Sequence, residues 1–303
     1  MSVKRTSAVE AIEPVERTAW IGWLPVTVLP LSTLAVRAFL PSWGFMWALA
    51  FSLYAALKFL TWWRARRMPH SRWRSIAYLL AWPGMEAEPF LDANQFVRPP
   101  TSSKWAGAII ETAFGAALLW MVARTIPERL ALLRGWVGML GLILLLHFGS
   151  FQLLSLFWQT AGVNARPIMS APLRSRSLGE FWGKRWNLGF SHVAHDLIFR
   201  PLHRICGTDV TGFLVFVISG LIHDAVISFP AGAGYGLPTM YFMIQGAGVM
   251  FERSSLGKRL ALRQGIRGWI FMAAFTSVPA FWLFHPCFVR RVILPFMQAI
   301  RAL

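Results

Sequence analysis

The chain has 303 residues, of which 56% are hydrophobic and only 14% are charged, and its formal net charge is +17. An ordinary soluble domain of this length would carry about a quarter charged residues, so the composition excludes that class and indicates an all-α, polytopic membrane protein. The basic excess does not indicate a nucleic-acid-binding protein, because no basic segment stands apart from the apolar runs and no zinc, helix-turn-helix or RNA-binding motif occurs. We therefore expect one integral membrane domain over residues 1–303, with no nucleic acid partner and with membrane lipids around it.

Seven apolar runs are long enough, or nearly so, to cross a bilayer. They are predicted as spans at 19–39, 43–63, 105–123, 135–158, 209–229, 237–251 and 268–288, of which 237–251 is the shortest. A further run, 75–82, is too short to span, and Pro83 and Gly84 end it, so it is predicted to be re-entrant or interfacial. The expected count is seven to eight transmembrane helices. The tail 289–303 has apolar residues at helical spacing among arginines, which predicts a short interfacial helix.

Lysine and arginine set the predicted orientation. With the amino terminus inside, the cytoplasmic segments hold 22 of these residues and the outside segments hold 6. A cytoplasmic amino terminus is therefore expected. Lys4 and Arg5 are followed by glutamates and by no small-residue cleavage site, so we predict no removable signal peptide.

Residues 177–204 predict an amphipathic helix that begins with a capping box, Ser177-Leu-Gly-Glu180. An aromatic-rich face recurs at three and four residues along it. A second face is small and polar, and its members are Gly183, Asn187, Ser191 and His195. Two interpretations stay open from the pattern alone: a surface that receives an acyl chain, or an interfacial helix whose Lys184 and Arg185 meet lipid phosphates.

His223 and Asp224 lie in the middle of the apolar run 212–229. An acidic residue near the centre of a spanning helix costs about 2.5 to 3.5 kcal/mol on insertion scales, so such residues usually face a cavity and carry function. Burial favours neutral imidazole, which can act as a base, although a histidine that only ties two helices together is an equal alternative. Adjacent helical side chains point about 100° apart, so Asp224 is expected to contact another element rather than the His223 ring.

Several other kinds of site are not predicted. No histidine pair has metal-ligand spacing, and Cys206 and Cys287 are too far apart in sequence to indicate a metal site or a disulfide framework. His147 lies in a second apolar run and is interpreted as a polar tie between helices. No Gly-x-Ser-x-Gly elbow or phosphate-binding loop occurs.

Three stretches resemble the membrane-bound O-acyltransferase (MBOAT) superfamily and, within it, the wax synthase-like branch. They are Tyr78-Leu-Leu-Ala-Trp-Pro-Gly-Met85, Ser177-Leu-Gly-Glu-Phe-Trp-Gly-Lys-Arg-Trp-Asn187 with the following Phe199-Arg-Pro-Leu202, and Ser219-Gly-Leu-Ile-His-Asp224. The last two are the more specific, with 36 residues between Asn187 and His223. The strongest resemblance covers residues 170–255, and Asp224 stands where the branch usually has glutamate.

The resemblance implies an MBOAT-like helical fold and an enzyme that transfers an acyl group from acyl-CoA to the hydroxyl of a lipophilic alcohol. It implies that His223 is catalytic, that Asn187 is its polar partner and that Asp224 has a supporting role. Candidate acyl-CoA contacts are Trp182, Lys184, Arg185 and Trp186. Such a transfer needs no cofactor beyond acyl-CoA as cosubstrate. The alternatives are a short-chain O-acyltransferase acting on a sugar or natural product, and a transporter or non-catalytic membrane protein.

Overall fold

The computed structural model describes residues 19–303, which are helices and connecting segments without strands. The predicted cytoplasmic amino terminus and the absence of a signal peptide concern residues 1–18, which lie outside the described residues. The all-α fold class is confirmed.

The α-helices are α1 (Leu24–Ala35), α2 (Ser42–Ala65), α3 (Arg72–Ala81), α4 (Ala87–Leu91), α5 (Ser102–Ala117), α6 (Ala123–Thr125), α7 (Ala131–Ile143), α8 (Phe151–Thr160), α9 (Leu178–Glu180), α10 (Leu188–Ala194), α11 (Arg200–Cys206), α12 (Thr208–Ala231), α13 (Leu237–Arg253), α14 (Ser255–Arg259), α15 (Gly265–Ser277), α16 (Ala280–Leu283), α17 (Pro286–Phe288) and α18 (Leu294–Ala299).

Five continuous helical stretches among residues 19–303 are long and apolar enough to cross a membrane. They are Ser42–Ala65, Ser102–Thr125, Glu128–Thr160, Thr208–Ala231 and Gly265–Leu283. A shorter apolar helix, Trp20–Ala35, falls in the first predicted span, and α13, with 17 residues, covers the predicted short span 237–251 and ends two residues beyond it. The protein is therefore an integral membrane protein, while the count of seven to eight spans stays a prediction.

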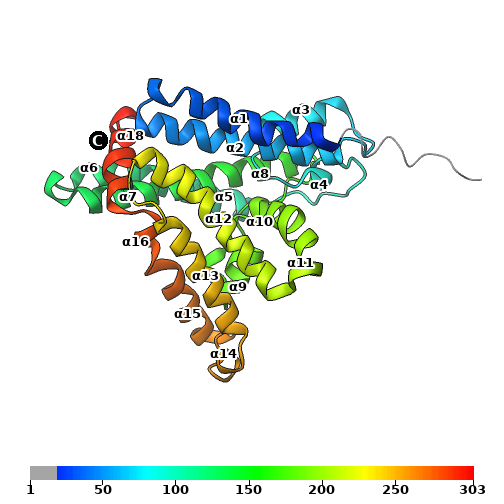
Figure 1. Cartoon of the computed structure of the whole chain (residues 1–303). Coiled ribbons are helices and arrows are strands. Elements are labelled where there is room, and N and C mark those ends of the chain that lie inside the picture. Colours follow the sequence, from blue (N-terminus) through cyan, green and yellow to red (C-terminus); the bar gives the residue numbers. More distant parts are fainter. Residues whose placement is uncertain (1–18) are drawn as a thin grey trace, which may run out of the picture.

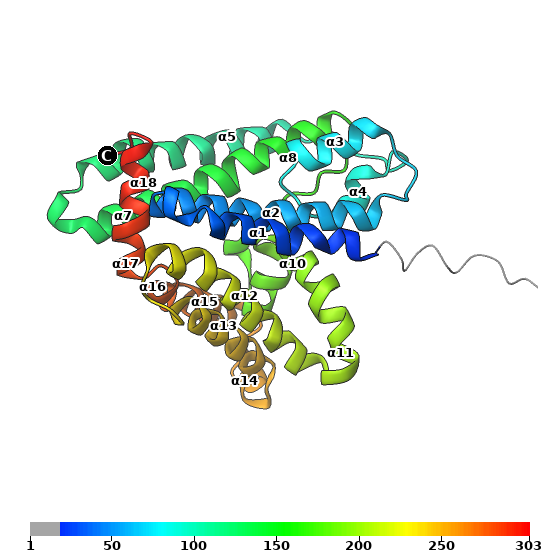
Figure 2. The same ribbon diagram turned by 45° about the horizontal axis from the view of Figure 1, so that its top comes forward.

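The helices form two groups that meet along one side of the molecule. Helices α1, α2, α5, α7 and α8 run alongside one another, while α13 leads away from them to a tip at α14 and α15 and α16 return from it (Figures 1 and 2). Helix α12 packs extensively on α13, which runs back along it. Helices α9 to α11 belong to the expected cytoplasmic loop 159–208, and α10 and α11 lead to the start of α12 (Figure 2).

The carboxy-terminal tail was expected to be an interfacial helix, and this prediction is wrong. Val289, Val292 and Met297 have no exposed surface and belong to the largest core cluster, with residues of α7, α12 and α13. The apolar spacing that suggested a membrane surface instead faces other helices of the protein. Arg291 donates to the carbonyl of Ala231, so this arginine holds the end of α12 rather than a lipid headgroup.

The run 75–82 forms part of α3, a helix of 10 residues that is partly enclosed by protein. Tyr78 is fully buried and packs on Phe90 of α4 and near Lys58 of α2. Beyond α3, the chain turns through Trp82 to Glu86 toward α10. In this short connection, called the 82–86 loop below, Met85 of the first resembling stretch lies against Gly189, two residues beyond the second.

Candidate active site

The single amphipathic helix predicted from Ser177 is broken in the structure. Helix α9 continues as a π-helical turn, Phe181–Arg185, and the chain then becomes extended at Trp186. Asn187 is left-handed, with φ 43° and ψ 59°, and α10 begins at the next residue. Asparagine tolerates this conformation better than most residues, which explains why the break falls here. The predicted stripe of Gly183, Asn187, Ser191 and His195 is therefore not one helical face.

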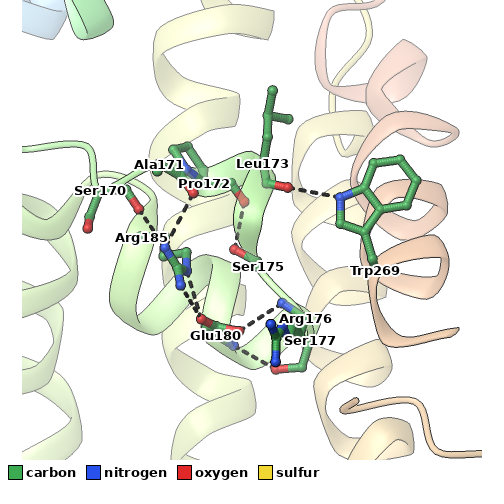
Figure 3. A network of polar contacts seen from close by, with 10 residues as sticks. All are labelled: Ser170, Ala171, Pro172, Leu173, Ser175, Arg176, Ser177, Glu180, Arg185 and Trp269. Carbon is green, nitrogen blue, oxygen red and sulfur yellow. Dashed lines mark hydrogen bonds and ion pairs between the residues drawn. The ribbon is translucent and has the colours of Figure 1, made fainter. Parts of the chain in front are cut away.

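The predicted capping box is half formed. The Ser177 hydroxyl accepts the backbone N–H of Glu180 at 3.0 Å. The Glu180 carboxylate does not return to Ser177 but accepts the backbone N–H of Arg176 at 2.8 Å and the side chain of Arg185 at 2.7 Å. Figure 3 shows this network, in which Arg185 also donates to the carbonyl of Ser170. The network fixes the turn that precedes Asn187.

Asn187 lies where the helix is interrupted, and both its backbone and its side chain are held by neighbouring residues. Its backbone N–H points to the sulfur of Met169 at 3.2 Å, and the next N–H, of Leu188, donates to the carbonyl of Ile168 at 2.8 Å. Its side-chain oxygen caps α10 by accepting the N–H of Phe190 at 3.5 Å. Because the oxygen is engaged, the amide nitrogen Nδ2 is the end of this side chain that remains to donate to a substrate.

His223 lies on α12 with its two ring nitrogens in different roles. Nδ1 is 2.7 Å from the carbonyl oxygen of Ser219. A carbonyl only accepts, so Nδ1 carries the proton, and in the neutral ring Nε2 then has a free lone pair. The ring is half-buried and packs on Phe242 of α13 with centroids 4.3 Å apart. This tautomer presents a base rather than an acid at Nε2.

Gly220 explains how α12 and α13 come so close beside His223. A Cβ at this position would lie 2.7 Å from the Cα of Thr239 and 3.1 Å from its carbonyl oxygen. Real side chains do not tolerate such a distance to backbone atoms, so only glycine allows this approach. In the stretch Ser219 to Asp224, Ser219 orients the histidine and Gly220 allows the neighbouring helix to approach it.

Asp224 contacts another element, as the sequence predicted. Its carboxylate accepts the backbone N–H of Gly236 at 3.0 Å and that of Thr239 at 3.1 Å, together with the Thr239 hydroxyl. These groups form the amino-terminal end of α13, where backbone donors lack partners within the helix and negative charge is favoured. Asp224 therefore caps the helix that packs on His223, and its supporting role in a reaction stays a prediction.

A series of aromatic contacts joins His223 to the segment before Asn187. Phe242, which touches His223, lies 5.6 Å from the ring of Trp182, and Trp182 lies 6.5 Å from Trp186. Among the described residues, no hydrogen bond joins Asn187 to His223. The ring contacts thus lead from His223 to Trp186, the residue before Asn187. That Asn187 and His223 belong to one catalytic centre stays a prediction.

The four candidate acyl-CoA contacts differ in their surroundings. Trp182 and Trp186 are partly buried in the aromatic cluster around α13. Arg185 is engaged by Glu180 and by the carbonyl of Ser170, so its guanidinium holds the fold. Lys184 is exposed, and within residues 19–303 it has no hydrogen bond or ion pair. Lys184 is thus the candidate whose charge is available to a ligand.

Two buried polar residues that sequence reasoning missed hold this arrangement. Gln245 of α13 is fully buried, accepts the indole N–H of Trp182 at 3.2 Å and donates to the carbonyl of Phe275 at 2.7 Å. Glu252, 1% exposed, accepts the backbone N–H groups of Leu178 at 2.8 Å and Gly179 at 2.9 Å. A glutamine within the largely apolar stretch 237–251 and a glutamate directly after it were the signal available in the sequence.

Within the part of the chain that the structure describes, no group of three histidine, cysteine or acidic side chains could hold a metal ion. His147, interpreted as a polar tie between helices, has no hydrogen bond among residues 19–303, and its buried Nδ1 is without a partner. Its ring packs edge-on against Phe151. The tie is therefore not formed.

Comparison with known proteins finds that this part of the chain is similar to one family. Residues 165–244, which include Asn187, His223 and Asp224, match the model of the Membrane bound O-acyl transferase family. The chain is similar to "Probable long-chain-alcohol O-fatty-acyltransferase 7" of Arabidopsis thaliana, 30% identical over 145 residues, which are 43% of this chain and 42% of the relative. It is also similar to "Long-chain-alcohol O-fatty-acyltransferase" of Simmondsia chinensis, 28% identical over 143 residues, 43% of this chain and 40% of the relative.

A third relative is "Acyl-CoA--sterol O-acyltransferase 1" of Arabidopsis thaliana, 28% identical over 141 residues, 41% of this chain and 39% of the relative. The match thus spans about two fifths of the length of each of these curated relatives. The resemblance to the membrane-bound O-acyltransferase superfamily and its wax synthase-like branch is confirmed by these comparisons.

Proposed function

We propose that the protein is a membrane-embedded O-acyltransferase that moves an acyl group from acyl-CoA to the hydroxyl of a lipophilic alcohol. The observation that carries the proposal is the state of His223, whose Nδ1 donates to the carbonyl of Ser219 and whose Nε2 is left as a base inside an apolar helix pair. Two relatives are named for long-chain alcohols and one for a sterol, which supports a lipophilic acceptor.

In the proposed reaction, Nε2 of His223 takes the proton of the alcohol as its oxygen attacks the thioester carbonyl carbon. The carbonyl oxygen becomes an oxyanion, to which Nδ2 of Asn187 donates. The C–S bond then breaks, the carbonyl re-forms as an ester, and the imidazolium returns its proton to the leaving CoA thiolate. General base catalysis of this kind contributes about 10² to 10⁴-fold. No metal or redox cofactor enters this balance.

Charge supports access of acyl-CoA from the end of the molecule at α14. Five basic residues between Arg253 and Arg267 are exposed there: Arg253, Lys258, Arg259, Arg263 and Arg267. The segment that precedes Asn187 packs against this end, since the Arg176 carbonyl would lie 2.0 Å from a Cβ on Gly268. An excess of lysine and arginine is typical of the cytoplasmic side, where acyl-CoA is found, and basic groups attract its phosphates.

The aromatic side chains between Trp186 and Phe242 form an apolar surface along which we propose that the acyl chain lies. Trp182 and Trp186 lie between the basic end and Phe242, and His223 is eight residues, about 12 Å along the helix axis, from the far end of α12. We therefore propose that the CoA nucleotide stays near Lys184 and the exposed arginines while its thioester reaches Asn187 and His223.

The test is a mass-spectrometric assay of the purified protein with a panel of acyl-CoAs of several chain lengths and with fatty alcohols, sterols and sugars. His223→Ala and Asn187→Ala are compared with the unaltered protein at equal folded amounts. His203→Ala is the matched control, because His203 lies on α11 and its ring bonds only a carbonyl of its own helix, that of Arg200.

We expect an ester with a lipophilic alcohol, lost by at least about 10²-fold in His223→Ala and reduced by about 10² to 10³-fold in Asn187→Ala. The His203 variant should keep the full rate. Undiminished transfer by His223→Ala would refute the mechanism. Formation of a sugar ester in place of a lipid ester would show that the acceptor is a sugar and not a lipophilic alcohol.

A further inference from the structure

The carboxylate of Glu86 forms a bridge outside the residues discussed so far. Its Oε1 lies 2.6 Å from Nδ1 of His192, and its Oε2 lies 2.9 Å from Nη1 of Arg166. The side chain of Glu86 is 18% exposed, whereas those of His192 and Arg166 are about half exposed. Three segments far apart in the sequence therefore meet at one carboxylate.

Both partners of Glu86 belong to segments that hold Asn187. His192 lies on α10, the helix that Asn187 caps. Arg166 belongs to the segment that continues to Ile168 and Met169, which contact the backbone N–H groups of Leu188 and Asn187. Glu86 thus ties together the two supports that fix the direction of the Asn187 side chain.

The 82–86 loop is itself anchored, so the bridge has a fixed base. Tyr54 of α2 donates to the carbonyl of Trp82 at 3.2 Å, and buried Lys58 of α2 donates to the carbonyl of Gly84. Trp158 of α8 donates to the carbonyl of Ala81, just before the loop, at 3.0 Å. A rigid carboxylate can position a partner, whereas one on a mobile segment cannot.

The loop also packs directly on α10. A Cβ at Gly189 would lie 3.3 Å from the backbone nitrogen of Met85, so the helix and the loop are in close contact two residues beyond Asn187. The ion pair at His192 lies one turn further along the same helix. The two contacts together fix both the distance of α10 from the loop and its rotation.

From this geometry we propose that Glu86 is a positioning residue for Asn187 and that protonated His192 completes the bridge, so that acyl transfer depends on the proton of a histidine outside the catalytic centre. The proposal rests on the function proposed above. Glu86 and His192 do not touch the reacting atoms in this scheme. They keep the Nδ2 donor of Asn187 directed at the thioester oxygen.

The charges around the pair favour its ionised form. Burial acts to raise the pKa of Glu86, but the hydrogen bonds and charges of His192 and Arg166 outweigh it and hold that pKa below its ordinary value. The hydrogen bond that His192 donates to Glu86 raises the pKa of His192, and the charges of Glu86 and Asp196 act in the same direction. Burial and the charge of Arg166 act to lower this pKa. Tyr78 of α3 is the further titratable group near Glu86, and burial raises its pKa well above the ordinary value, so it stays neutral.

The experiment compares Glu86→Gln, His192→Gln and His192→Lys with the unaltered protein, using an acyl-CoA and an alcohol that give ester, across pH 6 to 10. Glu86→Gln should lower kcat about tenfold to a hundredfold, because a misplaced donor of this kind costs up to about 10² in rate. The KM for acyl-CoA should stay within about twofold. In the unaltered protein, kcat should fall as pH rises through the pKa of His192.

Two substitutions at His192 separate positioning from a merely structural role. His192→Gln should remove the alkaline fall of kcat and lower its plateau, whereas His192→Lys keeps a cation to higher pH and should move the alkaline fall upward. Glu128→Gln is the matched control, because it removes one carboxylate of a surface pair whose Glu128 side chain is 93% exposed. It should change neither kcat nor the pH profile.

The outcomes distinguish this proposal from the proposed function. Equal kcat and an equal pH profile in folded Glu86→Gln would overturn the positioning role while leaving the transferase intact. An alkaline limb that His192→Lys does not move would overturn the role of the His192 proton. If the unaltered protein forms no ester with any panel member, the proposed function is wrong. A double-mutant cycle on thermal unfolding would still measure whether Glu86 and His192 are coupled, independently of that function.

Discussion

Asp224 of α12 accepts the backbone N–H of Thr239 at 3.1 Å and its hydroxyl as well, and so caps α13 from a neighbouring helix. At the other end of α13, Glu252 accepts the N–H groups of Leu178 and Gly179 and so caps α9. Two acidic side chains therefore connect the helix of His223 to the segment that leads to Asn187. Each is placed where a helix amino terminus stabilises negative charge, which explains how acids are retained among apolar helices.

Removal of the Asp224 carboxylate should loosen α13 rather than abolish a chemical step. Asp224→Ala leaves three donors without partners, and we expect a loss of about 1 to 3 kcal/mol in the free energy of unfolding, with a lower kcat as Phe242 moves from His223. Thermal unfolding in detergent measures the loss of stability, and the rate per folded molecule measures the change in kcat. Asp209→Ala is the control, since Asp209 begins the same helix but is 68% exposed. Full stability of Asp224→Ala would contradict the capping role.

Gly220 and Gly212 on α12 offer a direct test of the close helix contact. Gly220→Ala would place a Cβ 2.7 Å from the Thr239 Cα, and we expect it to cost about 1 to 3 kcal/mol and to lower transfer. Gly212→Ala meets nothing within 4 Å, so it should be neutral or stabilising by up to about 1 kcal/mol. Chemical denaturation of the two variants in the same detergent decides the matter, and equal stabilities would argue against the close packing.

The sequence predicted the helical class better than the arrangement of the candidate residues. Composition and long apolar runs predict helices directly, because a segment that crosses a bilayer must satisfy its own backbone hydrogen bonds. The break at Asn187 was missed because periodicity continued through it, and only backbone contacts with Ile168 and Met169 reveal the left-handed turn. The tail 289–303 was assigned to an interface because an apolar face looks the same whether lipid or protein covers it.

The role of Asp224 shows a similar limit. Helical geometry was enough to predict that Asp224 does not face the His223 ring, but its partner, the first turn of α13, depends on how two helices pack. Gln245 in the middle of the predicted span 237–251 and Glu252 just after its end were missed because each is an isolated polar residue in the sequence. Their partners come from α9, α15 and the π-helical turn, which no local pattern in the sequence identifies.

Stability should depend on pH through Glu180 in the acid range. The N–H of Arg176 and the side chain of Arg185, against partial desolvation, hold the pKa of Glu180 below its ordinary value. A depressed folded-state pKa gives stability that is present above the unfolded value of about 4.5 and is lost as pH falls through the folded value. Glu180→Gln should therefore be less stable at neutral pH and less sensitive to acid. Unfolding curves between pH 3 and 7 test this, and parallel pH profiles of the two proteins would contradict it.

Gln245 should be the buried polar residue whose loss most disturbs Trp182. Gln245→Leu has similar volume but leaves the indole N–H of Trp182 and the carbonyl of Phe275 without their partner, at a cost of about 1 to 3 kcal/mol. Gln298→Leu, at an exposed position of α18, is the matched control and should change stability by less than about 0.5 kcal/mol. Because Trp182 lies between Trp186 and Phe242, the Gln245 variant should also raise the KM for long-chain acyl-CoA more than that for short-chain acyl-CoA. Unfolding and KM measured on both variants decide this, and a chain-length-independent KM would remove Trp182 from the proposed acyl route.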